Sequence, residues 1–211
     1  MMKSIQKVLV LAPHTDDGEI GCGGTIAGFV RKKKEVYYVA FSIAEDSIPE
    51  GLPKDILATE VTKATRELGI KNNHLLIYKY RVRRFARARQ EILENLVALN
   101  REIGPDLVLM PSINDLHQDH FTIANEGLRA FKKTSILSYE IPWNNLNFST
   151  QCYVTLTEDD LNRKINALNC YESQKFRSYF SEEFIRSLAI TRGTQIGDKY
   201  AEVFEVVRWK L

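Results

Sequence analysis

Three of the four histidines of this 211-residue chain lie in two short acidic segments. The first segment reads Pro13-His14-Thr15-Asp16-Asp17-Gly18-Glu19 and the second reads Asp115-Leu116-His117-Gln118-Asp119-His120. Imidazole and carboxylate groups bind zinc and its neighbours, and a catalytic zinc takes three ligands from the protein and keeps one position for water. We expect His14, Asp17 and one or both of His117 and His120 to bind a divalent metal. The fourth histidine, His74, has no acidic neighbours and is interpreted as a loop or surface residue.

The carboxylates that remain in the two segments can assist hydrolysis of an amide or ester. Zinc lowers the pKa of its water toward about 7, so a neighbouring carboxylate can act as a general base at neutral pH. Asp16 is our candidate for that base. His117 is placed to stabilise the charge that develops on the carbonyl oxygen, and Asp119 is placed to hold a histidine of its own segment and favour its protonated form.

Each acidic segment directly follows an apolar run that is typical of a buried strand. These runs are Lys7–Ala12 and Asp106–Met110. Further strands are predicted at residues 37–42, 75–78, 136–141, 152–156 and 200–209, and helices around residues 26–34, 57–68, 92–103, 119–131 and 158–168. Strands that alternate with helices predict an α/β fold with an open, mostly parallel sheet and helices on both faces. Ligands of such sheets bind beyond the carboxyl ends of the strands, where both acidic segments lie.

Other notable residues have a structural and a functional interpretation. Gly21 to Gly24 can be a tight turn between strand and helix or a phosphate cradle, and we favour the turn because no phosphate-loop lysine follows. The arginines between residues 81 and 89 suit a solvated helix start, and Arg84 alone is kept as a candidate substrate-binding residue. Cys22 is interpreted as a packing residue, and Tyr139 and Trp143 as core or rim aromatics.

The composition excludes several other classes of protein. A hydrophobic content of 44% over 211 residues suits one domain, residues 1–211, that buries its own core. A net charge of +2 gives no indication of nucleic acid binding. The three cysteines are widely spaced, which favours a reducing compartment and a cytoplasmic location. We see no signal-peptide pattern in the N-terminal residues and no apolar run long enough to span a membrane. The sequence is compatible with a homo-oligomer.

These motifs together resemble those of the LmbE-like or PIG-L-like zinc-dependent N-deacetylases, which remove acetyl groups from N-acetylglucosamine-type amino sugars. His14-Thr15-Asp16-Asp17 is similar to the family's His-Pro-Asp-Asp motif, and His117-Gln118-Asp119-His120 to its His-Pro-Asp-His motif. The glycine run, Tyr171-Glu172-Ser173-Gln174 and Tyr200-Ala201-Glu202-Val203-Phe204 resemble further family segments, so the similarity covers nearly the whole chain.

The resemblance implies a Rossmann-like fold and one zinc ion per chain, although another divalent transition metal also suits the ligands. It implies His14, Asp17 and His120 as metal ligands, Asp16 as the base, and His117 with Asp119 behind it as the oxyanion-stabilising group. Thr15 and Gln118 replace prolines of the family pattern, and Glu19 stands one step later than the family's usual glutamate, so we assign Glu19 no catalytic role.

The sequence therefore predicts a hydrolase that deacetylates an N-acetylated amino sugar or sugar conjugate. One alternative keeps the metal but acts on a non-sugar amide or ester. The other is a non-catalytic module whose glycines and arginines bind a nucleotide or polyanion. Metal analysis separates these alternatives, because such a module does not need the histidines.

Overall fold

The computed structural model describes residues 5–210, and the first four residues of the N-terminal segment and Leu211 lie outside the described residues. Its centre is a seven-stranded sheet in the order β3-β2-β1-β4-β5-β7-β6. The strands are β1 (Lys7–His14), β2 (Glu35–Ser42), β3 (Leu75–Ile77), β4 (Leu107–Pro111), β5 (Ser135–Tyr139), β6 (Cys152–Thr155) and β7 (Ala201–Arg208). The first five strands in this order, β3, β2, β1, β4 and β5, are parallel to one another, while β7 pairs antiparallel with both β5 and β6. The predicted mostly parallel α/β sheet is confirmed.

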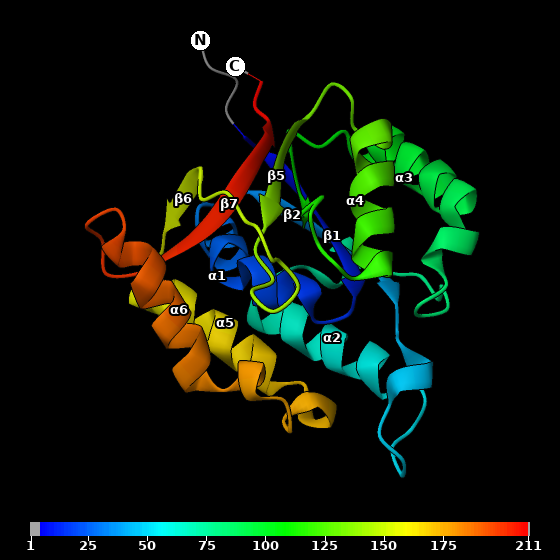
Figure 1. Ribbon diagram of the computed structural model, residues 1–211, viewed down its shortest axis with the longest axis horizontal. Helices are drawn as coiled ribbons and strands as arrows, with labels where there is room; N and C mark the ends of the chain where they lie inside the picture. Colours follow the sequence, from blue (N-terminus) through cyan, green and yellow to red (C-terminus); the bar gives the residue numbers. More distant parts are fainter. Residues whose placement is uncertain (1–4, 211) are drawn as a thin grey trace.

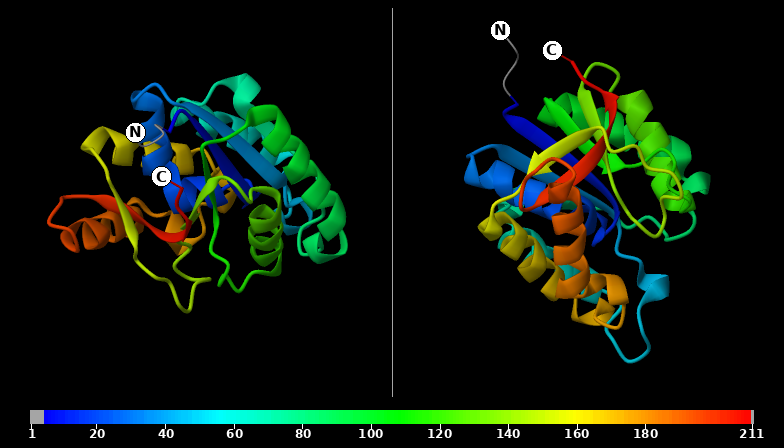
Figure 2. Two further views of the ribbon diagram at one scale, coloured as in Figure 1. Left: turned by 90° about the horizontal axis from the view of Figure 1, so that it is seen from above. Right: turned by 60° about the vertical axis from the view of Figure 1, so that its left-hand side comes forward.

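Six helices cover the two faces of the sheet (Figure 1). They are α1 (Asp17–Arg31), α2 (Ile56–Glu67), α3 (Arg89–Ile103), α4 (Gln118–Ala130), α5 (Glu158–Asn169) and α6 (Glu182–Thr194). Helices α3 and α4 pack together on one face, and α1, α2 and α5 pack together on the other, where α6 lies against α5 (Figure 2). None of the helices in residues 5–210 has the length and apolar character needed to cross a membrane.

The central strand β1 is buried from both sides because both faces carry helices. Val8, Val10 and Ala12 belong to the core on the α1 side, whereas Leu9 and Leu11 belong to the core on the α3 side. All five side chains are fully buried. A strand between two helical layers needs apolar residues at every position, which explains the continuous apolar run in the sequence.

Helix α1 begins earlier than the sequence predicted. The glycine run was expected to form a turn, but Gly21 to Gly24 lie inside the helix, which is kinked at Cys22 with a φ of −149°. A Cβ atom on Gly21 would lie 2.2 Å from Cδ2 of Tyr139, and one on Gly24 would lie 2.6 Å from Cδ1 of Leu156. The glycines therefore allow the helix to approach its neighbours closely, and this packing replaces the expected turn.

The kink in α1 leaves backbone N–H groups that the C-terminal strand satisfies. Glu202 on β7 accepts hydrogen bonds from the N–H groups of Gly24 at 3.0 Å and Thr25 at 2.7 Å. Lys164 on α5 pairs with the same carboxylate at 2.6 Å. This buried ion pair lets Glu202 cap the second half of α1, so the Tyr200-Ala201-Glu202 segment has a structural role.

Two further details differ from the sequence predictions. Helix α6 was not predicted. His74 was interpreted as a loop or surface residue: it does lie in the connection between α2 and β3, in a 3-10 turn, but it is only 9% exposed and stacks on Tyr37 with ring centroids 4.1 Å apart. Its Nδ1 lies 3.2 Å from the carbonyl oxygen of Val36, so this buried ring nitrogen has a hydrogen-bond partner.

Candidate metal centre and active site

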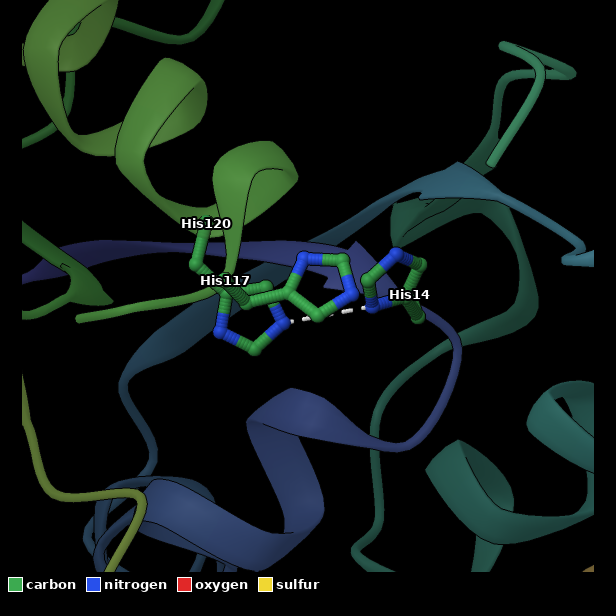
Figure 3. Close-up of side chains that lie close together, drawn as sticks. All are labelled: His14, His117 and His120. Atoms are coloured by element: carbon green, nitrogen blue, oxygen red, sulfur yellow. Dashed lines mark hydrogen bonds between the residues drawn. The ribbon is translucent and has the colours of Figure 1, made fainter. Parts of the chain in front are cut away.

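The sheet topology brings the two acidic segments together. Strand β1 ends at His14 and its parallel neighbour β4 ends at Pro111, so the chain leaves both strands at the same edge. His14 is the last residue of β1, while His117 caps the N-terminus of α4 and His120 lies in its first turn. Figure 3 shows the three imidazoles turned toward one another from these two elements.

Three side-chain atoms from these segments form a small triangle. Nδ1 of His14 lies 3.1 Å from Oδ2 of Asp17, and Nε2 of His120 lies 3.2 Å from the same oxygen. The two nitrogens are themselves 3.2 Å apart. Ligand atoms at zinc-bond lengths of about 2.0–2.2 Å in a tetrahedral site are separated by about 3.3 Å. The triangle therefore fits three ligands of one metal ion.

The third imidazole lies beside this triangle. The ring of His117 has its centroid 4.8 Å from that of His14 and 4.7 Å from that of His120. His14, His117 and His120 offer nitrogen atoms that all lie within 4.8 Å of one another, and this cluster can hold a metal ion. The backbone N–H of Asp119 donates to Nδ1 of His117 at 3.2 Å, which places the proton of a neutral His117 ring on Nε2.

Two carboxylates fix the rings of the other histidines. Asp115 Oδ2 lies 2.8 Å from Nδ1 of His120, and Asp119 Oδ2 lies 3.2 Å from Nε2 of His14. Each contact leaves the opposite ring nitrogen free to act as a ligand, as in many metal sites. The sequence had placed Asp119 next to a histidine of its own segment, but its carboxylate contacts His14 of the other segment. Asp115 had no predicted role.

Asp119 also ties the site to the arginine-rich loop. Its carboxylate accepts hydrogen bonds from the backbone N–H groups of Arg83 at 2.5 Å and Phe85 at 3.3 Å. Arg83 has a φ of 63°, a left-handed conformation that is unusual for a residue with a side chain. The hydrogen bonds that this loop gives to Asp119 therefore come from its backbone, not from its arginine side chains.

The charges of the triangle stabilise one another in the absence of metal. Burial lowers the pKa of His14, but Asp17 and Asp119 outweigh this effect and raise it to about 9. Burial likewise lowers the pKa of His120, yet Asp17 and Asp115 raise it to about 10. Burial raises the pKa of Asp17, but the two histidines hold it well below its ordinary value.

The pKa values of Asp16 and His117 shift in the directions opposite to those of Asp17 and of the other two histidines, because Asp16 and His117 form no ion pair in the triangle. Burial and the nearby Asp17 raise the pKa of Asp16 to about 6. Burial and the charges of His14 and His120 lower the pKa of His117 to about 4. The sequence had left open whether a charged or a neutral histidine stabilises the oxyanion, and the lowered pKa of His117 and the bond to its Nδ1 favour a neutral ring with a proton on Nε2. Near pH 7 Asp16 can accept a proton and His117 can donate a hydrogen bond.

A buried network holds the backbone of the loop that carries Asp16. Tyr38 and Tyr171 donate to the carbonyl oxygen of Thr15, at 2.9 and 2.7 Å. Both hydroxyls also contact the carboxyl group of Glu19, which is fully buried. Burial raises the pKa of Glu19 to about 8. Glu19 does not line the cavity described below, and its contacts support the loop from behind.

Five of the predicted residues, His14, Asp16, Asp17, His117 and His120, open onto a cavity of about 400 Å³, whereas Asp119 lies buried behind its lining. This lining combines the two acidic segments with residues from several other parts of the chain: His14, Thr15, Asp16, Asp17, Ile20, Ala44, Ser47, Leu57, Val82, His117, His120, Trp143, Asn144, Gln174, Arg177 and Tyr179. Arg84 is exposed and lies outside this lining, and Arg177 is the arginine that lines it. The sequence pointed to this wall only through the Tyr171–Gln174 segment.

The sheet and the histidine cluster define a class: an α/β protein able to hold a metal ion beyond the carboxyl ends of its parallel strands. Residues 9–131 match the model of the PIG-L family, described as GlcNAc-PI de-N-acetylase, and the chain belongs to this family. The family predicted from the two histidine motifs is thereby confirmed, and with it the enzyme class, an N-deacetylase.

One curated relative is the diacetylchitobiose deacetylase of Thermococcus kodakarensis. It is 25% identical over 94% of this chain and 82% of its own length. The structure is also similar to that of the N,N'-diacetylchitobiose deacetylase from Pyrococcus horikoshii in complex with an inhibitor, with a TM-score of 0.80 and 24% identity over 97% of this chain and 84% of the other.

A second similar structure shows that this fold also serves other chemistry. GalB, the 4-carboxy-2-hydroxymuconate hydratase from Pseudomonas putida, has a TM-score of 0.80 and 19% identity over 98% of both chains. At these identities the two structural similarities establish the fold alone. The reaction must be argued from the family and from the residues of the site.

Proposed function

We propose that this chain is a zinc-dependent hydrolase that removes the acetyl group from an N-acetylated amino sugar or a conjugate of one. The observation that carries the proposal is the triangle of His14 Nδ1, Asp17 Oδ2 and His120 Nε2, with Asp16 in the same cavity. Family membership and the similarity to a diacetylchitobiose deacetylase support the sugar substrate.

His14, Asp17 and His120 would hold one metal ion through these three atoms. Two nitrogens and one oxygen suit zinc and also other divalent transition metals. His117 is the less suitable ligand, because the hydrogen bond to its Nδ1 places a proton on Nε2. When bound, the metal would supply a Lewis acid that polarises the acetamide carbonyl and acidifies water.

The residues of the chain would then perform the proton transfers. Asp16 takes a proton from the attacking water as the water oxygen bonds to the acetamide carbon. His117 donates a hydrogen bond from Nε2 to the carbonyl oxygen as negative charge develops there. Asp16 returns its proton to the nitrogen as the C–N bond breaks, and the products are acetate and the free amine.

The surroundings of Asp16 support this role. Asp16 comes directly before Asp17 in the chain but takes no part in the triangle, and its pKa of about 6 suits a base that works near neutral pH. We propose that residues 1–211 act as one catalytic domain. The three cysteines of the chain are unpaired, which supports action in the reducing cytoplasm.

Acetate release by the zinc-loaded protein from a panel of N-acetylated sugars and sugar conjugates tests this function. Asp16→Asn should lower the rate by about a hundredfold to ten-thousandfold, the usual contribution of a general acid–base group, with zinc content unchanged. Asp159→Asn, an exposed aspartate on α5, is the matched control. An Asp16→Asn rate close to that of the unsubstituted protein would exclude Asp16 as the base.

A further inference from the structure

Arg177 brings a positive charge to a cavity whose other charged walls are acidic or imidazole groups. It lies in the segment between α5 and α6 and lines the cavity together with His14, Asp16 and Asp17. It is close enough to Asp16 for its charge to act on that carboxyl group. Among residues 5–210 no carboxylate forms an ion pair with Arg177. A half-buried cation without a counter-ion is unusual in a protein.

The side chain of Arg177 is nevertheless held in place. Its Nη1 donates to the hydroxyl of Tyr179, and its guanidinium carbon lies 5.6 Å from the centroid of that ring. Tyr179 in turn stacks on Trp143, with centroids 3.7 Å apart and an interplanar angle of 19°. The guanidinium therefore has a fixed support on one side.

The other edge of the guanidinium is unused. Nε of Arg177 is buried and has no hydrogen-bond partner within the part of the chain that the structure describes, and no bond from Nη2 is found there. Nε and Nη2 together form the edge that binds two oxygens of a carboxylate or phosphate side by side. A buried N–H without a partner costs free energy unless a ligand supplies one.

Two other arginines show what fills this edge elsewhere in the same chain. Arg31 donates from Nε and Nη2 to the two oxygens of Asp160, at 3.1 and 2.8 Å. Arg192 makes the corresponding pair of bonds to Glu140. Arg177 has the same edge, but it lines the active-site cavity and meets no acidic side chain.

We propose that Arg177 binds an anionic group of the substrate, a phosphate or carboxylate carried close to the acetamido group. This inference rests on the proposed function and narrows its substrate to negatively charged N-acetylated sugars. Asp16 and Asp17, which line the same cavity, repel an anion, and Arg177 is the arginine of that lining that can attract one. On an amino sugar, a substituent close to the acetamido group is carried by one of the carbon atoms that adjoin the acetamido-bearing carbon.

Binding to Asp16→Asn protein, which should not consume its ligands, tests this inference by calorimetry. The ligands are neutral N-acetylglucosamine, its 1-phosphate, and N-acetylmuramic acid, which carries a carboxylate. We expect at least one anionic ligand to bind more tightly than the neutral sugar. Adding Arg177→Met should lower the affinity for that ligand by about tenfold to a hundredfold, the usual loss for hydrogen bonds to charged groups. The affinity for the neutral sugar should change little.

Two controls separate local from general effects. Arg87→Met removes the same charge from an exposed position outside the cavity and should leave all three affinities unchanged. Arg177→Lys keeps the positive charge but cannot form bidentate hydrogen bonds, so it should lower the affinity for the anionic ligand by an intermediate factor. This variant also takes the place of Arg177→Met if Arg177→Met does not fold.

The preferred ligand identifies the anion as phosphate or carboxylate. Equal binding of neutral and anionic sugars, or an equal loss for all three on changing Arg177, would overturn the inference. Because binding needs no turnover, failure of acetate release in the unsubstituted protein would refute the proposed function without refuting the anion site.

Discussion

Nδ1 of His14 lies 3.2 Å from Nε2 of His120, although the two residues are separated by 106 positions in the chain. Oδ2 of Asp17 lies within 3.2 Å of both nitrogens. Asp119 and Asp115 hold the far side of each ring. The three atoms are thus positioned by protein contacts alone, so the fold prepares the site for a metal ion.

Metal binding should release protons near neutral pH. The pKa values of about 9 for His14 and about 10 for His120 lie above the ordinary value of 6.5, so both rings keep their protons at pH 7 in the metal-free protein. A metal must displace these protons, and apparent zinc affinity should therefore rise as pH increases toward 9. Calorimetry in buffers of different ionisation enthalpy should detect release of about two protons per zinc at pH 7. Binding without proton release would contradict the assigned ligands.

Removing the support of His120 should weaken the metal site without removing a ligand. Asp115 contacts Nδ1 of His120 and also accepts the backbone N–H of His117 at 2.8 Å. Asp115→Ala should lower zinc affinity by about tenfold to a hundredfold, the usual effect of losing such a partner. Asp115→Asn keeps a hydrogen-bond acceptor and should lower the zinc affinity by a smaller factor. Competition with a chromophoric chelator measures both, and equal zinc affinity in all three proteins would show that Asp115 has no such role.

The fold and the two histidine motifs could be predicted because each depends on a local pattern. Continuous apolar runs such as Leu107–Pro111 mark strands that are buried on both faces. The periodic apolar residues of α2 and α3 end at Gly69 and Gly104, which have φ values of 84° and 59°, as expected for residues that end helices. The helix predicted around residues 158–168 begins at a capping box formed by Thr157 and Asp160.

The remaining features depend on tertiary contacts. Helix α6 was missed because only Ile185, Ala189 and Gly193 are buried, too few to give a clear period. The glycines of α1 are explained by how closely Tyr139 approaches, which no local pattern reveals. The cavity wall around Arg177 comes from a segment with no motif of its own. Arg84 drew attention by its arginine-rich surroundings, but that loop reaches the site through backbone N–H groups and the side chain of Val82.

The backbone conformation of Arg83 gives a test of the loop that supports Asp119. Its φ of 63° costs about 1–2 kcal/mol for a residue with a Cβ atom, and glycine avoids that cost while keeping the N–H that Asp119 accepts. Glycine also costs about 0.4–1 kcal/mol through the unfolded chain. Arg83→Gly should therefore change the free energy of unfolding by between zero and a gain of about 1.6 kcal/mol.

Arg84 is the matched control for this substitution. Its φ is −128°, so Arg84→Gly relieves no strain and should lower the free energy of unfolding by about 0.4–1 kcal/mol. Urea unfolding of the metal-free proteins measures both variants. If Arg83→Gly is less stable than Arg84→Gly, the left-handed conformation of Arg83 is not a source of strain.

A crystal structure of the zinc-soaked protein, with anomalous data collected at the zinc edge, tests the central claim most directly. We expect one zinc ion per chain bonded to His14 Nδ1, Asp17 Oδ2 and His120 Nε2, with Asp16 unligated and Nε2 of His117 directed at the open side. Absence of a peak between these atoms, or a zinc ion held by His117 in place of Asp17, would contradict it.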